Sequence, residues 1–542
     1  MKLSPLQLIY VVALLVASNN ATAQTTSNTC SPIDSSTASE TRTIVGEITI
    51  NANDIFDLKL SGETKYIHRF GNRFHKQTRA EVIEQQLLFK SGDAFDLAKI
   101  VESERLLRQN DYLKSATITV VERCGNAIKI SVTTRDHWSL IPKILYKRTG
   151  GESRAGIEVT EANLFGSGKE LTFSFEQGVE RDQTILEYRD KHVFGSRRQL
   201  TLQRQDNTDG ERQLLEFKLP FYALDSTRAW RVAVDRSQLL SPLYTDRKIT
   251  TIYDLDSRFA DINFGFSKGL EANTLHRFWF GARFDETKLI DVSNGDAQVE
   301  LPDRRFVYPY IAWQFQQPHF VKRSNLYMME QVEDISLGHF FEARIGIASE
   351  SFDSSVDALV LHTQYRKGWQ GGNSLGLFST KLDTFRIDSQ YVNTIASPQM
   401  QWFWFQSSGR TLVLSAKAAI GDKLFAENQF LAGGDNGLRG YPLRMQSGSR
   451  RVLLSAEQRW YLNWYPWNLV RIGAAAFLDA GRAWNSDNAD QADWLGNGGV
   501  GLRFLSTRHA NALVVHVDVA IPFDQREDID RVQLLLGSKA VF

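Results

Sequence analysis

The chain has 542 residues, of which 63 are basic, 63 are acidic and 42% are hydrophobic. Its formal charge of zero provides no overall field to attract nucleic acid, so composition argues against a nucleic-acid partner. After the first residues, no run approaches the ~20 apolar residues of a membrane-spanning helix. A transmembrane barrel is not excluded, because its strands alternate lipid-facing and lumen-facing residues and keep the mean hydropathy low, here -0.30.

Residues 1–23 have the pattern of a secretory signal peptide. Lys2 precedes an apolar run from Leu6 to Ala17, and Ala21-Thr22-Ala23 has the small-x-small form of a signal peptidase site. The polar residues 24–42 that follow are interpreted as a linker. We therefore expect an exported protein whose folded part begins near residue 43.

The sequence offers no catalytic or metal-binding pattern. Residues 165–168 read Phe-Gly-Ser-Gly and lack the leading glycine of a nucleophile elbow, and no His-Glu-x-x-His occurs. Cys30 and Cys124 could form a disulfide in an oxidising compartment, but the sequence leaves that pairing open. They lack the clustered partners that a metal site requires. We expect a non-catalytic protein without a metal, a cofactor or a small-molecule substrate.

Residues 43–136 combine helical and strand patterns and are expected to form one small α+β domain. Its helices are marked by start signals: residues 78–81 match a capping box, and Asp96 precedes a second apolar-periodic run. A turn at Gly125-Asn126 separates two alternating runs. In chain order we expect a strand through Ile48 and Ile50, a helix from Thr78, a helix from Asp96, and strands over residues 116–120 and 128–132. The predicted order is βααββ.

Residues 137–542 show short alternating runs bounded by Gly, Asn and Asp. Leu171, Phe173 and Phe175 alternate with polar residues, as on a strand with one apolar face. A soluble sandwich would show the same period. The export signal, the aromatic content and a chain that ends in strand pattern favour a transmembrane barrel. At ~25 residues for each strand and connection, this region would make about 16 antiparallel strands.

The stretch Leu431 to Pro442, which contains Leu438-Arg439-Gly440-Tyr441, resembles the signature loop of the BamA/TamA superfamily of outer-membrane assembly and translocation barrels. Three further motifs follow in the order of that family: residues 455–460, 477–481 and 499–504. Residues 88–95 and 104–113 likewise resemble a POTRA domain. The resemblance implies a short member with a single POTRA-like domain in the periplasm and a barrel in the cell outer membrane.

In that family the arginine loop folds into the lumen like a latch. The corresponding positions here are Gly434, Gly437, Arg439, Gly440 and Tyr441. Strand parity provides acceptors: if Leu454 and Ala456 face lipid, Glu457 faces the lumen, and the same reasoning turns Asp479 inward. An arginine can bridge two such acids with its planar donors. The alternative is an ordinary solvated loop arginine.

The C-terminus resembles a β-signal, the closing strand that assembly machinery recognises by edge pairing. The residues that carry this pattern are Val532, Leu534, Leu536, Gly537 and Phe542. The alternative is that they form only the last strand. In the family the first and last strands make a seam that can open sideways, and the candidates here are residues 139–146 and 531–541.

The family resemblance implies a non-catalytic factor that inserts or translocates polypeptides at the outer membrane. POTRA domains bind extended chains at a sheet edge, so the expected partners are the lipid bilayer and a periplasmic client polypeptide or assembly partner. The alternative is a passive outer-membrane pore or a structural barrel. The sequence names neither the client nor an oligomeric state.

Overall fold

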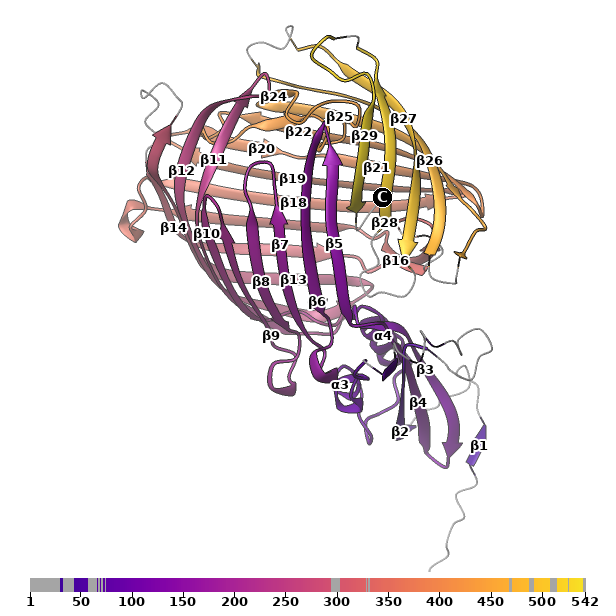
Figure 1. Cartoon of the computed structure of the whole chain (residues 1–542). Helices are drawn as coiled ribbons and strands as arrows, with labels where there is room; N and C mark the ends of the chain where they lie inside the picture. Colours follow the sequence, from indigo (N-terminus) through magenta and orange to yellow (C-terminus); the bar gives the residue numbers. More distant parts are fainter. Residues whose placement is uncertain are drawn as a thin grey trace, which may run out of the picture. The chain divides into compact units, whose positions relative to one another are not determined.

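The computed structural model of the chain (Figure 1) describes residues 30–32, 43–56, 66, 69, 72–73, 75–293, 303–327, 329, 332–466, 470–486, 492–506, 514–524 and 526–539. The expected signal peptide and Phe542 lie outside these residues. The chain divides into two compact units, one of residues 1–49, 88–101 and 118–132 and the other of residues 50–87, 102–117 and 133–542. In the described part of the chain, no helix has the length and apolar character needed to cross a bilayer.

The N-terminal elements follow the expected order βααββ. They are β2 (Ile44–Asn53), α3 (Ala80–Glu84), α4 (Leu97–Arg108), β3 (Leu113–Cys124) and β4 (Ala127–Asp136). The expected linker contributes a further short strand, β1 (Cys30–Pro32), which pairs with β3. The sheet order is β1-β3-β4-β2. A disulfide joins Cys30 to Cys124 and fixes β1 to the end of β3.

The two helix starts differ from each other. Asp96 caps α4 as expected, because its Oδ1 accepts a hydrogen bond from the backbone N–H of Ala98 at 2.9 Å. The prediction of a capping box at residues 78–81 is wrong. Arg79 occupies the cap position without a side-chain bond, and the Thr78 hydroxyl donates instead to the buried carboxylate of Asp136 at 3.0 Å. The oxygen of that hydroxyl, which would accept the cap bond, accepts from Asn163 Nδ2 at 2.8 Å instead.

A closed antiparallel barrel contains the strands from β5 to β29. Its segments are β5 (Leu140–Thr149), β6 (Glu152–Glu161), β7 (Lys169–Gln177), β8 (Gln183–Asp190), β9 (Gln199–Asn207), β10 (Gly210–Leu219), β11 (Arg228–Thr245), β12 (Lys248–Glu271), β13 (Thr274–Ser293), β14 (Arg304–Gln316), β17 (Phe340–Ala348), β18 (Ala358–Gly371), β19 (Ser374–Ile387), β20 (Gln390–Ala396), β21 (Gln399–Ser407), β22 (Arg410–Asp422), β25 (Arg450–Tyr461), β26 (Val470–Trp484), β27 (Leu495–Ser506), β28 (Val514–Pro522) and β29 (Gln533–Lys539).

These 21 segments make 20 barrel strands. β20 and β21 both pair with β19 and with β22, so they are two parts of one strand interrupted at Ser397 and Pro398. Proline cannot donate to the ladder, which explains the break. The expectation of about 16 strands was therefore too low.

The strands alternate as a transmembrane barrel requires. Leu171, Phe173 and Phe175 are 37–43% exposed on the outer face. On other strands, charged side chains occupy the inward-facing positions: Asp479 of β26 and Asp518 of β28 are each 3% exposed and face the lumen. An apolar exterior around a polar interior is the pattern expected for strands in contact with lipid.

Two connections carry small sheets of their own. β15 (Phe320–Ser324) pairs with β16 (Val332–Ser336) between β14 and β17, and β23 (Phe430–Ala432) pairs with β24 (Gln446–Gly448) between β22 and β25. Because the strands alternate in direction, these two connections lie at opposite ends of the barrel. The end that carries β15 and β16 otherwise includes two-residue turns such as Gly372-Asn373 and Ser408-Gly409.

Candidate functional site

The connection between β22 and β25, residues 423–449, folds back on itself, and residues 438–443 at its centre are largely buried. Beyond the β23–β24 pair, the backbone N–H groups of Gly434 and Leu438 donate to Pro442 O and Gly433 O at 3.0 and 3.1 Å. Its apolar side chains join a buried cluster with three barrel residues. The cluster includes Leu438, Tyr441 and Met445 from the loop and Leu453, Ala483 and Leu495 from β25, β26 and β27. A loop packed in this way has a fixed position on the barrel wall.

Glycines allow the loop to approach the wall. Gly437 has φ +112°, a backbone conformation that side-chain-bearing residues rarely adopt. A Cβ at Gly440 would lie 2.6 Å from the Cβ of Asn497, and one at Gly434 would lie 2.5 Å from the carbonyl oxygen of Tyr441. A larger residue at Gly440 would therefore push the loop off the wall, whereas one at Gly434 or Gly437 would disturb the fold of the loop itself.

Tyr441 attaches the loop to β27. Its hydroxyl accepts from the backbone N–H of Gly496 at 3.0 Å and lies 2.8 Å from Gly496 O and 3.0 Å from Asp524 Oδ2, either of which can accept its proton. Burial raises the pKa of Tyr441 to about 12, so the phenol keeps the proton that it donates. The tyrosine of the sequence motif is thus a structural attachment point.

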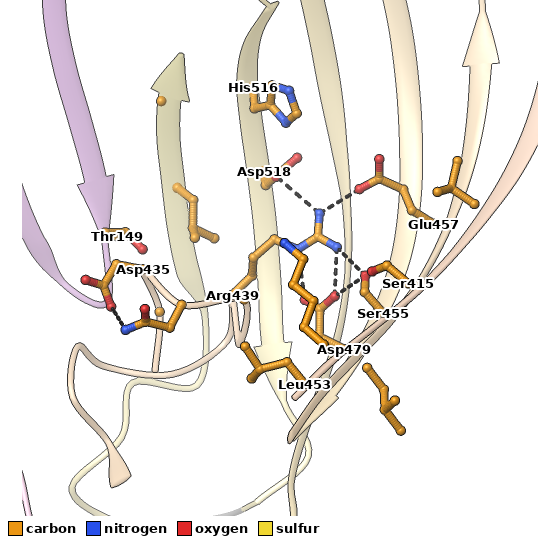
Figure 2. Close-up of a pocket in the computed structure, with 18 of the residues that line it drawn as sticks. Thr149, Ser415, Asp435, Arg439, Leu453, Ser455, Glu457, Asp479, His516 and Asp518 are labelled. Atoms are coloured by element: carbon orange, nitrogen blue, oxygen red, sulfur yellow. Dashed lines mark hydrogen bonds and ion pairs between the residues drawn. The ribbon is translucent and has the colours of Figure 1, made fainter. Parts of the chain in front are cut away.

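Arg439 lies at the centre of an ionic network in the lumen (Figure 2). Its Nε and Nη2 donate to the two carboxylate oxygens of Asp479, both at 2.8 Å, and its Nη1 donates to Glu457 Oε2 at 2.8 Å. Asp518 Oδ2 is 3.6 Å from the same Nη1. Burial alone would lower the pKa of the Arg439 guanidinium, but these acids raise it above its ordinary value. The structure thus brings the predicted arginine to both predicted acids.

Four strands supply the other charges of this network. Glu457 on β25 also binds Arg459 Nε at 2.9 Å and Arg503 Nη2 of β27 at 3.4 Å. Arg503 also binds Asp518 of β28 through Nη1. Three arginines face three acids, so the network is formally neutral. We call these six residues, Arg439, Glu457, Arg459, Asp479, Arg503 and Asp518, the lumen network.

Sequence reasoning did not identify Arg459, Arg503 or Asp518 as partners. A signal for two of them was present: Asp518 alternates with apolar valines in β28, and Arg503 lies within the motif at residues 499–504. Polar neighbours also support the network. Ser455 Oγ donates to Asp479 Oδ1 at 2.8 Å, and Asn497 Nδ2 donates to Asp479 Oδ2 at 2.9 Å. Asp479 is therefore bound on both oxygens, as a buried carboxylate must be.

A cavity lies between this network and the place where the barrel closes. Lys147, Arg148 and Thr149 of β5 line it together with Leu535, Leu536 and Gly537 of β29, and Arg439 lines its inner side. Within the described residues, β29 and β5 share a single register pair, Leu536 with Arg148. β28 and β29 share seven such pairs, and β5 and β6 share ten. We call the β29–β5 junction the seam.

A sequence model of the Omp85 superfamily domain matches residues 163–539, which include the loop, the lumen network and β29. The chain belongs to the Omp85 superfamily. This assignment confirms the resemblance seen in the loop motif and identifies the protein as a β-barrel of the outer membrane. It rests on a match that covers more than half of the chain.

Solved structures with low similarity to the chain were found as well. BamA from Haemophilus ducreyi lacking POTRA domains 1-3 is 12% identical, with a TM-score of 0.41, over 92% of this chain and 85% of that one. CdiB from Escherichia coli is 12% identical, with a TM-score of 0.48, over 91% of this chain and 76% of that one. No curated protein matches the sequence.

The predicted C-terminal residues of this Omp85 barrel have different positions. Val532 lies before β29 and is 55% exposed, so it is not part of the closing strand, contrary to expectation. Leu534 is 51% exposed on the outer face, and Leu536 and Gly537 lie beside the cavity at the seam. Phe542 is outside the described residues. Recognition of this strand as a β-signal stays a prediction.

A buried cluster in this Omp85 chain has the residue types of a catalytic triad. His75 Nε2 lies 2.7 Å from Asp136 Oδ2, and its Nδ1 lies 3.4 Å from the hydroxyl of Ser139. The side chains of His75 and Asp136 are fully buried, and Ser139 is 3% exposed. A substrate cannot reach this serine, so the cluster is interpreted as a satisfied polar core.

Removing the Omp85 loop arginine should weaken the barrel. In Arg439→Ala, Asp479 and Glu457 lose a buried cation, and we expect the free energy of unfolding to fall by about 3–5 kcal/mol while export is unchanged. The measurement is urea unfolding in detergent, together with the temperature at which the compact band unfolds on electrophoresis. Arg526→Ala is the control, because the exposed Arg526–Asp528 pair should contribute at most about 1 kcal/mol. Equal midpoints for both variants would reject the latch role.

Proposed function

We propose that this protein inserts or translocates polypeptides at the outer membrane by binding a client at a sheet edge and passing it through the barrel seam. The observation that carries the proposal is the single register pair that the described residues of β29 and β5 form, beside a cavity lined by both strands. A junction with few ladder bonds costs less to open than its neighbours, and its exposed edges can then pair with an incoming strand.

The N-terminal domain supplies a second sheet edge for a client. β2 lies at one side of the four-stranded sheet, whereas β1 covers the opposite side at Cys30–Pro32. Backbone groups at a sheet edge can pair with an extended chain of almost any sequence. We infer that residues 43–136 are a periplasmic POTRA-like domain and that β2 receives the client.

The lumen network supports the same function from within the barrel. It attaches the loop of residues 423–449 to strands β25, β26 and β28, and the cavity beside the seam is bounded by that loop. We infer that the loop acts as a latch that keeps the barrel wall ordered when the seam opens, and we call residues 423–449 the latch loop. No step of this function requires catalysis.

Reconstitution in liposomes tests the proposal. An unfolded outer-membrane barrel protein is added to vesicles that contain the full chain or a variant without residues 43–134, and protease-protected client is measured. A photo-crosslinker at Thr49 of β2 should capture the client, whereas one at Thr133, exposed on the central strand β4, should not. Insertion that depends on residues 43–134 would support the proposal. Ion conductance without insertion or crosslinks would identify a passive pore instead.

A further inference from the structure

The connection between β14 and β17, residues 317–339, enters the barrel from the end opposite the latch loop (Figure 1). Bacterial barrels have short turns at their periplasmic end, as at Gly372-Asn373. This connection instead forms the β15–β16 hairpin, with Val321 opposite Ile335 and Lys322 opposite Asp334. We call residues 317–339 the resident hairpin. Its length and its own sheet require a separate explanation.

The resident hairpin packs against apolar residues of the inner wall. Its Leu326, Ile335 and Leu337 are 0%, 9% and 3% exposed, and they share a buried cluster with Leu375 of β19, Phe403 of β21 and Val413 of β22. Tyr327 sets its ring edge-on to Phe403, with centroids 5.9 Å apart, and donates to Gln401 Oε1 at 3.0 Å. Gln401 and Val413 also line the cavity that contains Arg439, which places this patch on the lumen side.

The tip of the hairpin reaches toward the seam. Met329 is 3% exposed and packs with Leu505 of β27 and Val514 of β28, the strand next to β29. The carbonyl oxygen of Leu326 accepts from Arg459 Nη1 at 2.9 Å, and that of Asn325 accepts from the Tyr461 hydroxyl at 2.8 Å. Through Arg459 the hairpin connects with Glu457 of the lumen network.

The wall patch is apolar, in contrast to the charged lumen network beside it. A lumen that conducted only water and ions would not need it, since barrel interiors are polar. The patch is covered by the resident hairpin, which is amphipathic. Its apolar residues lie toward the wall, and residues of opposite charge are register partners at Lys322–Asp334 and Arg323–Glu333. An isolated two-stranded hairpin is marginally stable, so the occupant depends on the wall for its fold.

We propose that this inner-wall patch, made of Leu375, Phe403, Val413, Leu505 and Val514, is a docking site for an amphipathic β-hairpin of a client polypeptide, and that the resident hairpin occupies it until a client displaces it. We infer the kind of client from the resident hairpin, because a client that replaces it should have a similar structure. A hairpin with alternating apolar and polar residues is the repeating unit of a transmembrane barrel. The inference rests on the proposed function and specifies its substrate as a barrel protein in the course of folding.

A crosslinking experiment on the full chain in detergent micelles tests the docking site. A photo-crosslinker replaces Gln401, and the probe is a synthetic peptide of residues 514–539, the terminal hairpin of this barrel. Leu326→Asp should release the resident hairpin and raise the crosslinked yield about tenfold, since burial of a leucine is worth at least a factor of that size. Val332→Asp is the matched control, because Val332 belongs to the same hairpin but is 62% exposed.

Competition completes the test. A peptide of residues 319–337 should reduce the crosslinked yield, and a scrambled 514–539 peptide should give none. If Leu326→Asp does not fold, a variant with a short Gly-Ser turn in place of residues 320–336 replaces it. If the 319–337 peptide binds but the barrel hairpin does not, the resident hairpin is only a plug and the docking site is rejected. Crosslinking without client insertion in liposomes would reject the proposed function and leave the docking site standing.

Discussion

Glu457→Gln is expected to lower the free energy of unfolding of the barrel by about 3–5 kcal/mol, because it removes the charge shared by three buried arginines. Arg439, Arg459 and Arg503 lie 2.8, 2.9 and 3.4 Å from its carboxylate oxygens. Glutamine preserves the volume of the side chain but leaves three cations facing two acids. The remaining Asp479 and Asp518 cannot replace it, because each is already bound to an arginine.

Urea unfolding in detergent, followed by tryptophan fluorescence, measures this loss. Glu211→Gln is the control: Glu211 is 47% exposed and pairs with Arg204 at the surface, so its loss should cost at most about 1 kcal/mol. In the double variant Arg439→Ala/Glu457→Gln, the loss should be smaller than the sum of the two single losses, because both substitutions break the same contact. Strict additivity would mean that the arginine and the acid act independently and would contradict the network.

The same substitution should also loosen the two loops in the lumen. Glu457 holds the latch loop through Arg439 and the resident hairpin through Arg459, whose Nη1 binds Leu326 O. One carboxylate thus connects segments that enter the barrel from opposite ends. We therefore expect displacement of one loop to loosen the other through this residue.

Much of the site could be predicted from strand parity alone. The alternation in β25 and β26 turned Glu457 and Asp479 inward, and the loop motif supplied the arginine. Parity gives the face of a strand but not the depth of a residue along the barrel axis. Depth is set by register, which here aligns Ser455 with Asp479 and Asp479 with Asn497. The sequence signals for Asp518 and Arg503 gave a strand face and a motif, but their contacts with Arg439 and Glu457 were missed because no local pattern encodes the register.

The predicted number of barrel strands was wrong for a related reason. The estimate allowed ~25 residues for each strand and connection, as long outer loops would require. Many connections are much shorter, such as Asp246-Arg247 and Asp388-Ser389, where two residues in the left-handed region reverse the chain. The resident hairpin was missed because Phe320–Ser324 and Val332–Ser336 have the composition of any short strand. Their position inside the lumen depends on contacts with Phe403 and Val413, far away in the sequence.

A disulfide across the seam is expected to abolish client insertion without unfolding the barrel. The variant Arg148→Cys/Leu536→Cys places cysteines at the register pair that joins β5 to β29, and the native cysteines are already paired with each other. A covalent bond there prevents the two strands from separating. It should not unfold the barrel, because it joins two strands that are already adjacent in the closed barrel. Reduction should restore insertion to the level of the unmodified chain treated with the same reductant, which also opens the native Cys30–Cys124 bond.

The control for this tether lies at an ordinary strand pair. Val500→Cys/Val519→Cys joins β27 to β28 at register partners that are 61% and 39% exposed. This bond should leave insertion unchanged, because the β27–β28 ladder does not need to open. Insertion by the oxidised seam variant would show that the client does not pass between β5 and β29. The single register pair would then reflect only the point at which any barrel must close, and the route of the client would have to lie through the lumen.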